Sequence, residues 1–187
     1  MSQGPLEDDL DEALDDARRG EESGVVTLFR ALQPGLVGYL RHQAPGMEED
    51  LASEAWAGAA TLLPQFDGDA RAFRALLFTL ARRRTVDHYR KSARSPSVVE
   101  LTEADEPADG IDLETTVISD FSAQDAVEAL VKGLTAVQAE VVLLRVVGDL
   151  SVEQVAEILD RPPGSVRVIQ HRALQRLAKR FKKVVTR

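Results

Sequence analysis

The chain has 187 residues and a formal net charge of -8, a length that allows one domain or two small ones. Hydrophobic residues make up 44% of it but aromatic residues only 5%, so its cores must consist mainly of leucine, valine and alanine. That composition favours small helical bundles over sandwiches or barrels, and we expect an all-α fold. Cysteine is absent, which excludes disulfides and thiolate metal sites. We expect no cofactor and no metal ion.

The start of the chain and its hydropathy bear on where the protein works. Residues 1–12 contain no basic segment followed by an apolar run, so they do not predict a signal peptide. No stretch approaches the roughly 20 apolar residues that a membrane-spanning helix needs. We therefore expect a cytoplasmic protein without membrane insertion.

Charge divides the chain into blocks. Residues 71–94 hold eight basic residues and one acid, and residues 161–187 hold nine basic residues and no acid. Between them, residues 95–125 hold nine acids and no base, contain two prolines and lack helical periodicity. The pattern predicts an acidic N-terminal tail at 1–23, a helical domain at 24–94, an acidic flexible linker at 95–122 and a second helical domain at 123–187. Whether the tail forms a helix is left open.

Three helices are predicted in the first domain, at about residues 25–43, 50–63 and 71–93, because apolar residues recur there at spacings of three and four. Pro34 predicts a kink or a break in the first helix. The second half of the third helix is basic. Its candidate nucleic-acid-binding residues are Arg82, Arg83, Arg84, Asp87, His88, Tyr89, Arg90 and Lys91.

Cations can neutralise phosphates and a tyrosine ring can stack on a base, so this basic half suits a nucleic-acid strand. The alternative is a solvated helix end, where cations complement the helix dipole.

The second domain carries clear helix starts. After a short predicted helix at 125–132, Thr135 with Gln138 and Ser151 with Gln154 have the spacing of capping boxes. A turn at residues 160–163 then leads into a basic helix that begins at about Pro163. Two helices joined in this way predict a helix-turn-helix whose second helix enters the major groove of DNA. The candidate DNA-binding residues of that helix are Ser165, Arg167, Val168, His171, Arg172 and Arg176.

Arginine can form paired hydrogen bonds with guanine, which distinguishes that base in the major groove. The alternative is a structural helical hairpin whose basic face is solvated.

Four stretches in this order resemble a known family: EDLASEAWAGAATLLPQF, FRALLFTLARRRTVDHYRKSAR, LTAVQAEVVLLRVVGDLSVEQVAEIL and PPGSVRVIQHRALQRL. They are similar to the extracytoplasmic-function (ECF) sigma factors, the compact two-domain class of the bacterial sigma-70 family. The stretch VRVIQHRALQRL is similar to actinobacterial members of a sigma-D-like branch.

The resemblance implies a specificity subunit of RNA polymerase that has no catalysis of its own. It implies that the first domain recognises the minus-ten element and that the helix from Pro163 recognises the minus-thirty-five element. It also implies that the helix bearing Asp50, Ser53, Glu54 and Trp56 docks on the clamp coiled coil of core polymerase. Further partners of the family are the polymerase flap, promoter DNA and, for some members, an anti-sigma factor.

Two positions depart from the family pattern. Ser53 stands where the docking helix usually has glutamine, which puts the strength of that contact in question. Arg83 stands where many members have an asparagine near a flipped minus-ten base, which puts the base preference in question.

Other functions remain open at this stage. A stand-alone helix-turn-helix regulator would explain the second domain but leave the basic helix of the first unexplained. An enzyme has little support, since only Asp67 and Asp69 suggest a cation site and such residues more often begin a turn. A further hypothesis is that the acidic N-terminal segment masks one of the basic patches.

Overall fold

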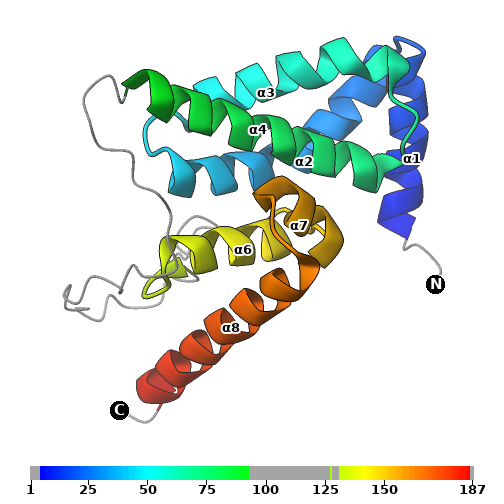
Figure 1. Ribbon diagram of the computed structural model, residues 1–187. Helices are drawn as coiled ribbons and strands as arrows, with labels where there is room; N and C mark the ends of the chain where they lie inside the picture. Colours follow the sequence, from blue (N-terminus) through cyan, green and yellow to red (C-terminus); the bar gives the residue numbers. More distant parts are fainter. Residues whose placement is uncertain (1–4, 93–126, 128–130, 186–187) are drawn as a thin grey trace. The chain divides into compact units, whose positions relative to one another are not determined.

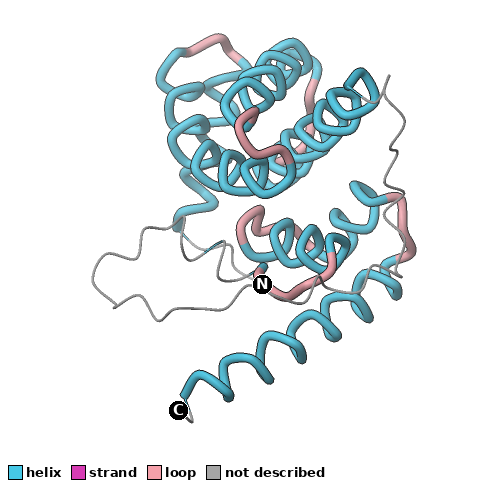
Figure 2. Tube along the Cα trace, turned by 90° about the vertical axis from the view of Figure 1, so that its left-hand side faces the viewer, coloured by secondary structure: helices cyan, strands magenta, loops and turns pink. Residues whose placement is uncertain are grey.

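The computed structural model describes residues 5–92, 127 and 131–185, and Figure 1 shows them as a set of helices. The described residues contain no strand (Figure 2). Contacts divide the chain into two compact units, residues 1–96 and residues 97–187. The expected all-α fold with two helical domains is confirmed. The predicted linker at 95–122 lies outside the described residues. None of the described helices is long and apolar enough to cross a membrane.

The described residues of the first unit form four α-helices and one short 3-10 helix. They are α1 (Pro5–Arg18), α2 (Glu22–Gln43), α3 (Glu48–Leu62), η1 (Leu63–Gln65) and α4 (Ala70–Ser92). Helix α2 contacts α1, α3 and α4, and α3 lies along α4. The three helices predicted for this domain are therefore present.

Helix α1 is packed into this unit through a small apolar face. Ala13, Leu14 and Ala17, which share one side of the helix, are at most 5% exposed. The backbone of α2 comes close to α1 at Gly24, where a Cβ atom would lie 2.4 Å from the carbonyl oxygen of Ala13. A glycine is needed there because α1 leaves no room for a side chain.

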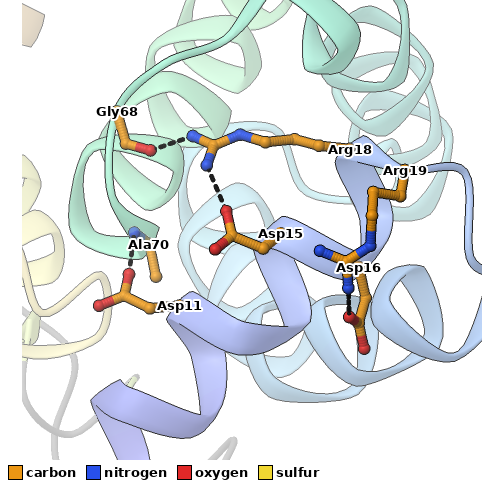
Figure 3. Close-up of polar contacts among 7 residues, drawn as sticks. All are labelled: Asp11, Asp15, Asp16, Arg18, Arg19, Gly68 and Ala70. Carbon is orange, nitrogen blue, oxygen red and sulfur yellow. Dashed lines mark hydrogen bonds and ion pairs between the residues drawn. The ribbon is translucent and has the colours of Figure 1, made fainter.

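Polar contacts tie α1 to the start of α4 (Figure 3). Oδ1 of Asp11 accepts a 2.7 Å hydrogen bond from the backbone N–H of Ala70, the first residue of α4. The guanidinium of Arg18 donates to the carbonyl oxygen of Gly68 and lies 5.6 Å from the ring centroid of Phe66. A carboxylate at a helix N-terminus also complements the helix dipole. Helix α1 therefore caps α4 from a distant part of the sequence.

The acidic N-terminal segment is thus not a tail separate from the first domain. The structure resolves the open question in favour of a helix, and the boundary predicted at residue 24 falls inside α2. Helix α1 lies at the end of the unit where α4 begins (Figure 1). Twelve residues of α4, or about 18 Å, separate Ala70 from Arg82. The structure does not support masking of the basic half of α4 by α1.

The core of the first unit follows the predicted pattern only in part. Of the kink or break predicted at Pro34, the break does not occur, because α2 continues through that residue. Val25 and Phe29, which fit the apolar spacing of three and four along α2, are 44% and 43% exposed. Phe78 of α4 is 1% exposed. Apolar spacing found the helices but not every buried side chain.

The second unit contains three described helices. They are α6 (Ala136–Val146), α7 (Val152–Leu159) and α8 (Pro163–Val185). Most of the helix predicted at 125–132 lies outside the described residues. Both predicted capping boxes are present: the backbone N–H of Gln138 donates to the Thr135 hydroxyl at 3.4 Å, and that of Gln154 donates to the Ser151 hydroxyl at 3.1 Å.

The turn between α7 and α8 is short and has a defined shape. Asp160 ends α7 in the left-handed region, with φ 52° and ψ 50°. Its backbone N–H returns to the carbonyl oxygens of Ala156 and Glu157, which closes the last turn of α7. Helix α8 then begins at Pro163, whose missing N–H costs nothing at that position. The local geometry is that of a helix-turn-helix.

Candidate nucleic-acid interface

Helix α8 is anchored by one apolar face. Val166, Ile169, Ala173 and Leu177 are at most 5% exposed, and their spacing of three and four places them on one side of the helix. This face packs against α6 and α7. It fixes the rotation of α8 about its own axis, and therefore decides which side chains point outward.

The opposite face carries the predicted DNA-binding residues. Arg167, Val168, His171, Arg172 and Arg176 are exposed, and Ser165 is half-buried. Val168 is 48% exposed, so an apolar side chain lies among the cations. Arginine suits guanine and an apolar group suits the methyl group of thymine, so this outer face has the chemistry of major-groove recognition.

Three of these outer residues have partners within the unit. Nη2 of Arg167 donates a 2.7 Å hydrogen bond to Oε1 of Glu153 on α7. Nη1 of Arg176 donates at 3.0 Å to Oε1 of Gln138, the residue that also closes the α6 capping box. Nε2 of His171 lies 2.9 Å from Nε2 of Gln175. Arg167 and Arg176 thus connect α8 to the two helices beneath it.

The basic half of α4 is less uniform. Arg83, Arg84, Asp87, Tyr89, Arg90 and Lys91 are exposed, whereas Arg82 and His88 are half-buried. Consecutive residues lie about 100° apart on a helix, so three successive arginines cannot share one face. Only part of the predicted basic set is therefore presented together.

Two contacts fix the surroundings of these cations. The hydroxyl of Tyr89 donates a 3.0 Å hydrogen bond to the carbonyl oxygen of Gln43, near the end of α2. Nε of Arg84 lies 3.6 Å from Oε2 of Glu54 on α3. Arg84, predicted to bind nucleic acid, therefore lies beside a residue predicted to bind polymerase.

The predicted docking residues lie on α3. Asp50, Ser53 and Glu54 are exposed and share one side of the helix. Trp56 differs, because it is half-buried and its Nε1 donates a 2.7 Å hydrogen bond to Oε1 of Gln33. Its ring lies 5.3 Å from that of Phe29 and 6.2 Å from that of Phe73. These contacts give Trp56 a packing role inside the unit.

The start of α3 holds one perturbed carboxyl group. The backbone N–H of Glu48 itself, then that of Gly46 at 2.7 Å and the Arg41 guanidinium, hold the pKa of Glu48 below its ordinary value. In the loop before α4, Oδ1 of Asp69 accepts a 2.7 Å hydrogen bond from the backbone N–H of Ala72 and so caps α4. A turn-forming role for Asp69 is thereby explained.

Sequence reasoning missed Glu153 and Gln138 as partners of α8. Glu153 is the second residue of α7. No motif in the sequence links it with Arg167, which lies fourteen positions later. Gln138 was assigned to its capping box alone. No short-range signal reveals either contact, since both require α8 to fold back over the helices before it.

Comparison with known proteins agrees with this architecture. The model of the sigma-70 region 2 family matches residues 28–95, and that of the sigma-70 region 4 family matches residues 124–177. The first match lies within the first unit and contains α3 and α4. The second lies within the other unit and contains α6, α7 and most of α8.

Whole-chain relatives are similar as well. The chain is 32% identical over 171 residues to the ECF RNA polymerase sigma factor ShbA of Streptomyces griseus, covering 86% of this chain and 89% of the relative. It is 29% identical over 179 residues to the ECF RNA polymerase sigma factor SigD of Mycobacterium tuberculosis, covering 90% and 82%. It is 30% identical over 176 residues to the ECF RNA polymerase sigma factor BldN of Streptomyces coelicolor, covering 90% and 64%. The resemblance noted in the sequence is confirmed, and the chain belongs to the ECF RNA polymerase sigma factors of the sigma-70 family.

Proposed function

We propose that the outer face of α8 reads the minus-thirty-five element of promoters as duplex DNA. The observation that carries this proposal is the division of α8 into a buried apolar face and an exposed face bearing Arg167, Val168, His171 and Arg172. Each good paired contact between an arginine and guanine contributes about 1–3 kcal/mol of discrimination. The other cations of α8 add affinity for phosphates without sequence preference.

The exposed basic residues of α4 are proposed to hold the opened strand of the minus-ten element. Arg83, Arg90 and Lys91 are exposed and can neutralise phosphates of a single strand. Tyr89 is 48% exposed beside them and offers a ring on which a base can stack. Flexible pyrimidine–purine steps are the easiest to unstack, so the opened element should contain one.

Asp50, Ser53 and Glu54 are proposed to dock α3 on the clamp coiled coil of core polymerase. Their exposure on one face of α3 supports this assignment. The packing of Trp56 inside the unit gives it an indirect part, in which it holds α3 against α2. A contact between the second unit and the polymerase flap completes the proposed assembly, which works in the cytoplasm.

In this assembly the protein is a dissociable specificity subunit, and polymerase carries out the bond chemistry. Free protein should bind promoters poorly, because its net charge is -8 and phosphates repel its acidic segments. Binding to core polymerase then presents both DNA-binding surfaces to one promoter.

Run-off transcription with purified actinobacterial core polymerase tests the proposal. A pool of genomic fragments is transcribed with and without the full-length protein, and discrete new start sites sharing two spaced motifs are expected. Promoter binding by the protein alone, with no initiation, would instead favour a stand-alone helix-turn-helix regulator.

The Arg172→Ala variant tests the α8 assignment within the same assay. Transcription that depends on the upstream element should be lost while binding to core polymerase is retained. Arg30→Ala is the matched control, because Arg30 is an exposed arginine of α2 outside both proposed DNA surfaces. Loss of polymerase binding by Arg172→Ala would contradict the assignment.

A further inference from the structure

We propose that Glu153 is a positioning residue for base recognition, which holds the Arg167 guanidinium in one orientation on the outer face of α8. This inference rests on the proposed reading of DNA by α8. Glu153 lies on α7, the helix that precedes α8, and not on α8 itself.

The geometry of the pair supports this role. Glu153 lies in the first turn of α7, directly after the Ser151 cap, and its Oε1 accepts the 2.7 Å hydrogen bond from Nη2 of Arg167. The contact crosses from one helix of the helix-turn-helix to the other. Because buried side chains fix the backbones of both helices, Glu153 and Arg167 start from fixed positions on neighbouring helices.

The pair remains open to an incoming ligand. The side chains of Arg167 and Glu153 are 59% and 61% exposed, so neither charge is enclosed by the protein. A guanidinium has five N–H donors, and the bond to Glu153 uses one of them. Four donors remain for a guanine edge or a phosphate, so the contact can orient Arg167 without occupying it.

Holding the Arg167 guanidinium in one orientation favours binding, because arginine loses rotamer freedom when it forms a paired contact with a base. A guanidinium that is already held loses less on binding. The stabilisation from Glu153 is specific to the orientation that it favours, whereas a carboxylate near DNA repels every phosphate alike. Glu153 should therefore sharpen base preference at one position while slightly weakening affinity for all sequences.

A structural role for Glu153 must be separated from this one. A carboxylate in the first turn of a helix also stabilises that helix through its dipole, whatever DNA is bound. Such an effect would act on all promoter sequences equally. The informative measurement is therefore base preference, position by position, and not overall activity.

The test uses holoenzyme assembled from core polymerase and the full-length protein, with a duplex promoter library randomised in the upstream element. Relative transcript yields give the preference at each base pair for the wild type, Glu153→Ala, Glu153→Gln and Glu157→Ala. Glu157 is the matched control, since it is an exposed glutamate one turn further along α7. Thermal unfolding of each variant verifies that the second unit is folded.

With Glu153→Ala, we expect the preference at one base pair to fall by about 1.5- to fivefold, the range for an exposed ion pair. Preferences at the other positions should stay as in the wild type. Glu153→Gln keeps an acceptor oxygen and should retain part of the preference, and Glu157→Ala should match the wild type. When Arg167→Ala is already present, adding Glu153→Ala should change nothing further at that base pair.

Three results would overturn the inference: an unchanged or sharper preference in Glu153→Ala, an equal loss at every position, or a further loss in the Arg167→Ala background. A wild-type holoenzyme without any preference in the upstream element would overturn the proposed reading by α8, and this inference with it. The first three results leave that reading intact, so the two failures are distinguishable.

Discussion

Helix α4 in the first unit and helices α6 and α7 in the second begin in different ways. Helix α4 has a local cap, Asp69, and a second one from Asp11 of α1, 59 positions before Ala70, whereas Thr135 and Ser151 cap α6 and α7 from the adjacent position. The first unit therefore depends on a contact between distant segments. In the second unit, the capping boxes that begin α6 and α7 each lie within four consecutive residues.

The same difference appears in the two basic helices. The cations of α8 lie opposite an apolar stripe of regular spacing, so its outer face can be assigned from the sequence. Arg82, Arg83 and Arg84 of α4 are consecutive and point in different directions, so only the packed structure shows which of them are exposed. A local pattern identifies a surface only where it also identifies the buried face behind it.

Replacing Leu14, the buried leucine of α1, should change the stability of the first unit relative to the second more than any of the substitutions that follow. Leu14 is 1% exposed, and we expect Leu14→Ala to reduce the stability of the first unit by about 2–5 kcal/mol through the cavity it leaves. Hydrogen exchange should accelerate in α2 and α4 but not in α6, α7 or α8. Leu10→Ala, at a half-buried position of the same helix, should cost less. Equal exchange in wild type and Leu14→Ala would mean that α1 does not support the unit.

The distant cap of α4 is the next target. Asp11→Ala removes the charged acceptor of the hydrogen bond that the N–H of Ala70 donates and should cost about 1–2 kcal/mol. Urea unfolding of the full-length chain, followed by a probe in α4, measures the change. Glu12→Ala removes an equal charge from an exposed neighbour and serves as control. If both variants lose the same stability, net charge rather than the cap is responsible.

The local cap of α7 is predicted to have a smaller and confined effect. Ser151→Ala should cost about 1 kcal/mol, because the N–H of Gln154 loses its acceptor. Faster hydrogen exchange is expected in α7, with no change in the first unit. Ser151→Thr keeps a hydroxyl acceptor and should behave nearly as the wild type. A response in α4 to Ser151→Ala would contradict the separation of local from distant capping.

The smallest predicted change is a gain in stability at the turn of the helix-turn-helix. Asp160 has φ 52°, a region that glycine occupies without steric cost, so Asp160→Gly should stabilise the second unit by about 0.5 kcal/mol. Glu157→Gly, inside α7, should instead destabilise it by about 1 kcal/mol. Thermal unfolding of both variants gives the two signs. A loss of stability in Asp160→Gly would show that its side chain contributes more than the backbone strain costs.

The parts of the fold predicted from the sequence are those with short-range signals. The sequence predicts the helix-turn-helix because Ser151 with Gln154 and Pro163 mark helix starts on either side of a short turn. The sequence does not decide whether residues 1–23 form a helix, because their charge is consistent with either a helix or an unfolded segment. The partners of α1, Gly68 and Ala70, lie about fifty to sixty residues away in the chain. Val25 and Phe29 fit the apolar spacing of α2 although they are 44% and 43% exposed, since spacing alone does not show how far a neighbouring helix extends.

The sequence by itself determined the all-α class, the order of the helices, the helix-turn-helix and the outer face of its second helix. Those features follow from periodicity and capping, which act between residues no more than four positions apart. Only the tertiary structure decided that α1 belongs to the first unit, that Trp56 packs inward and that Glu153 holds Arg167. Those contacts join residues that are 14 to 59 positions apart, and a bond over such a distance forms only where the packed cores bring the two segments together.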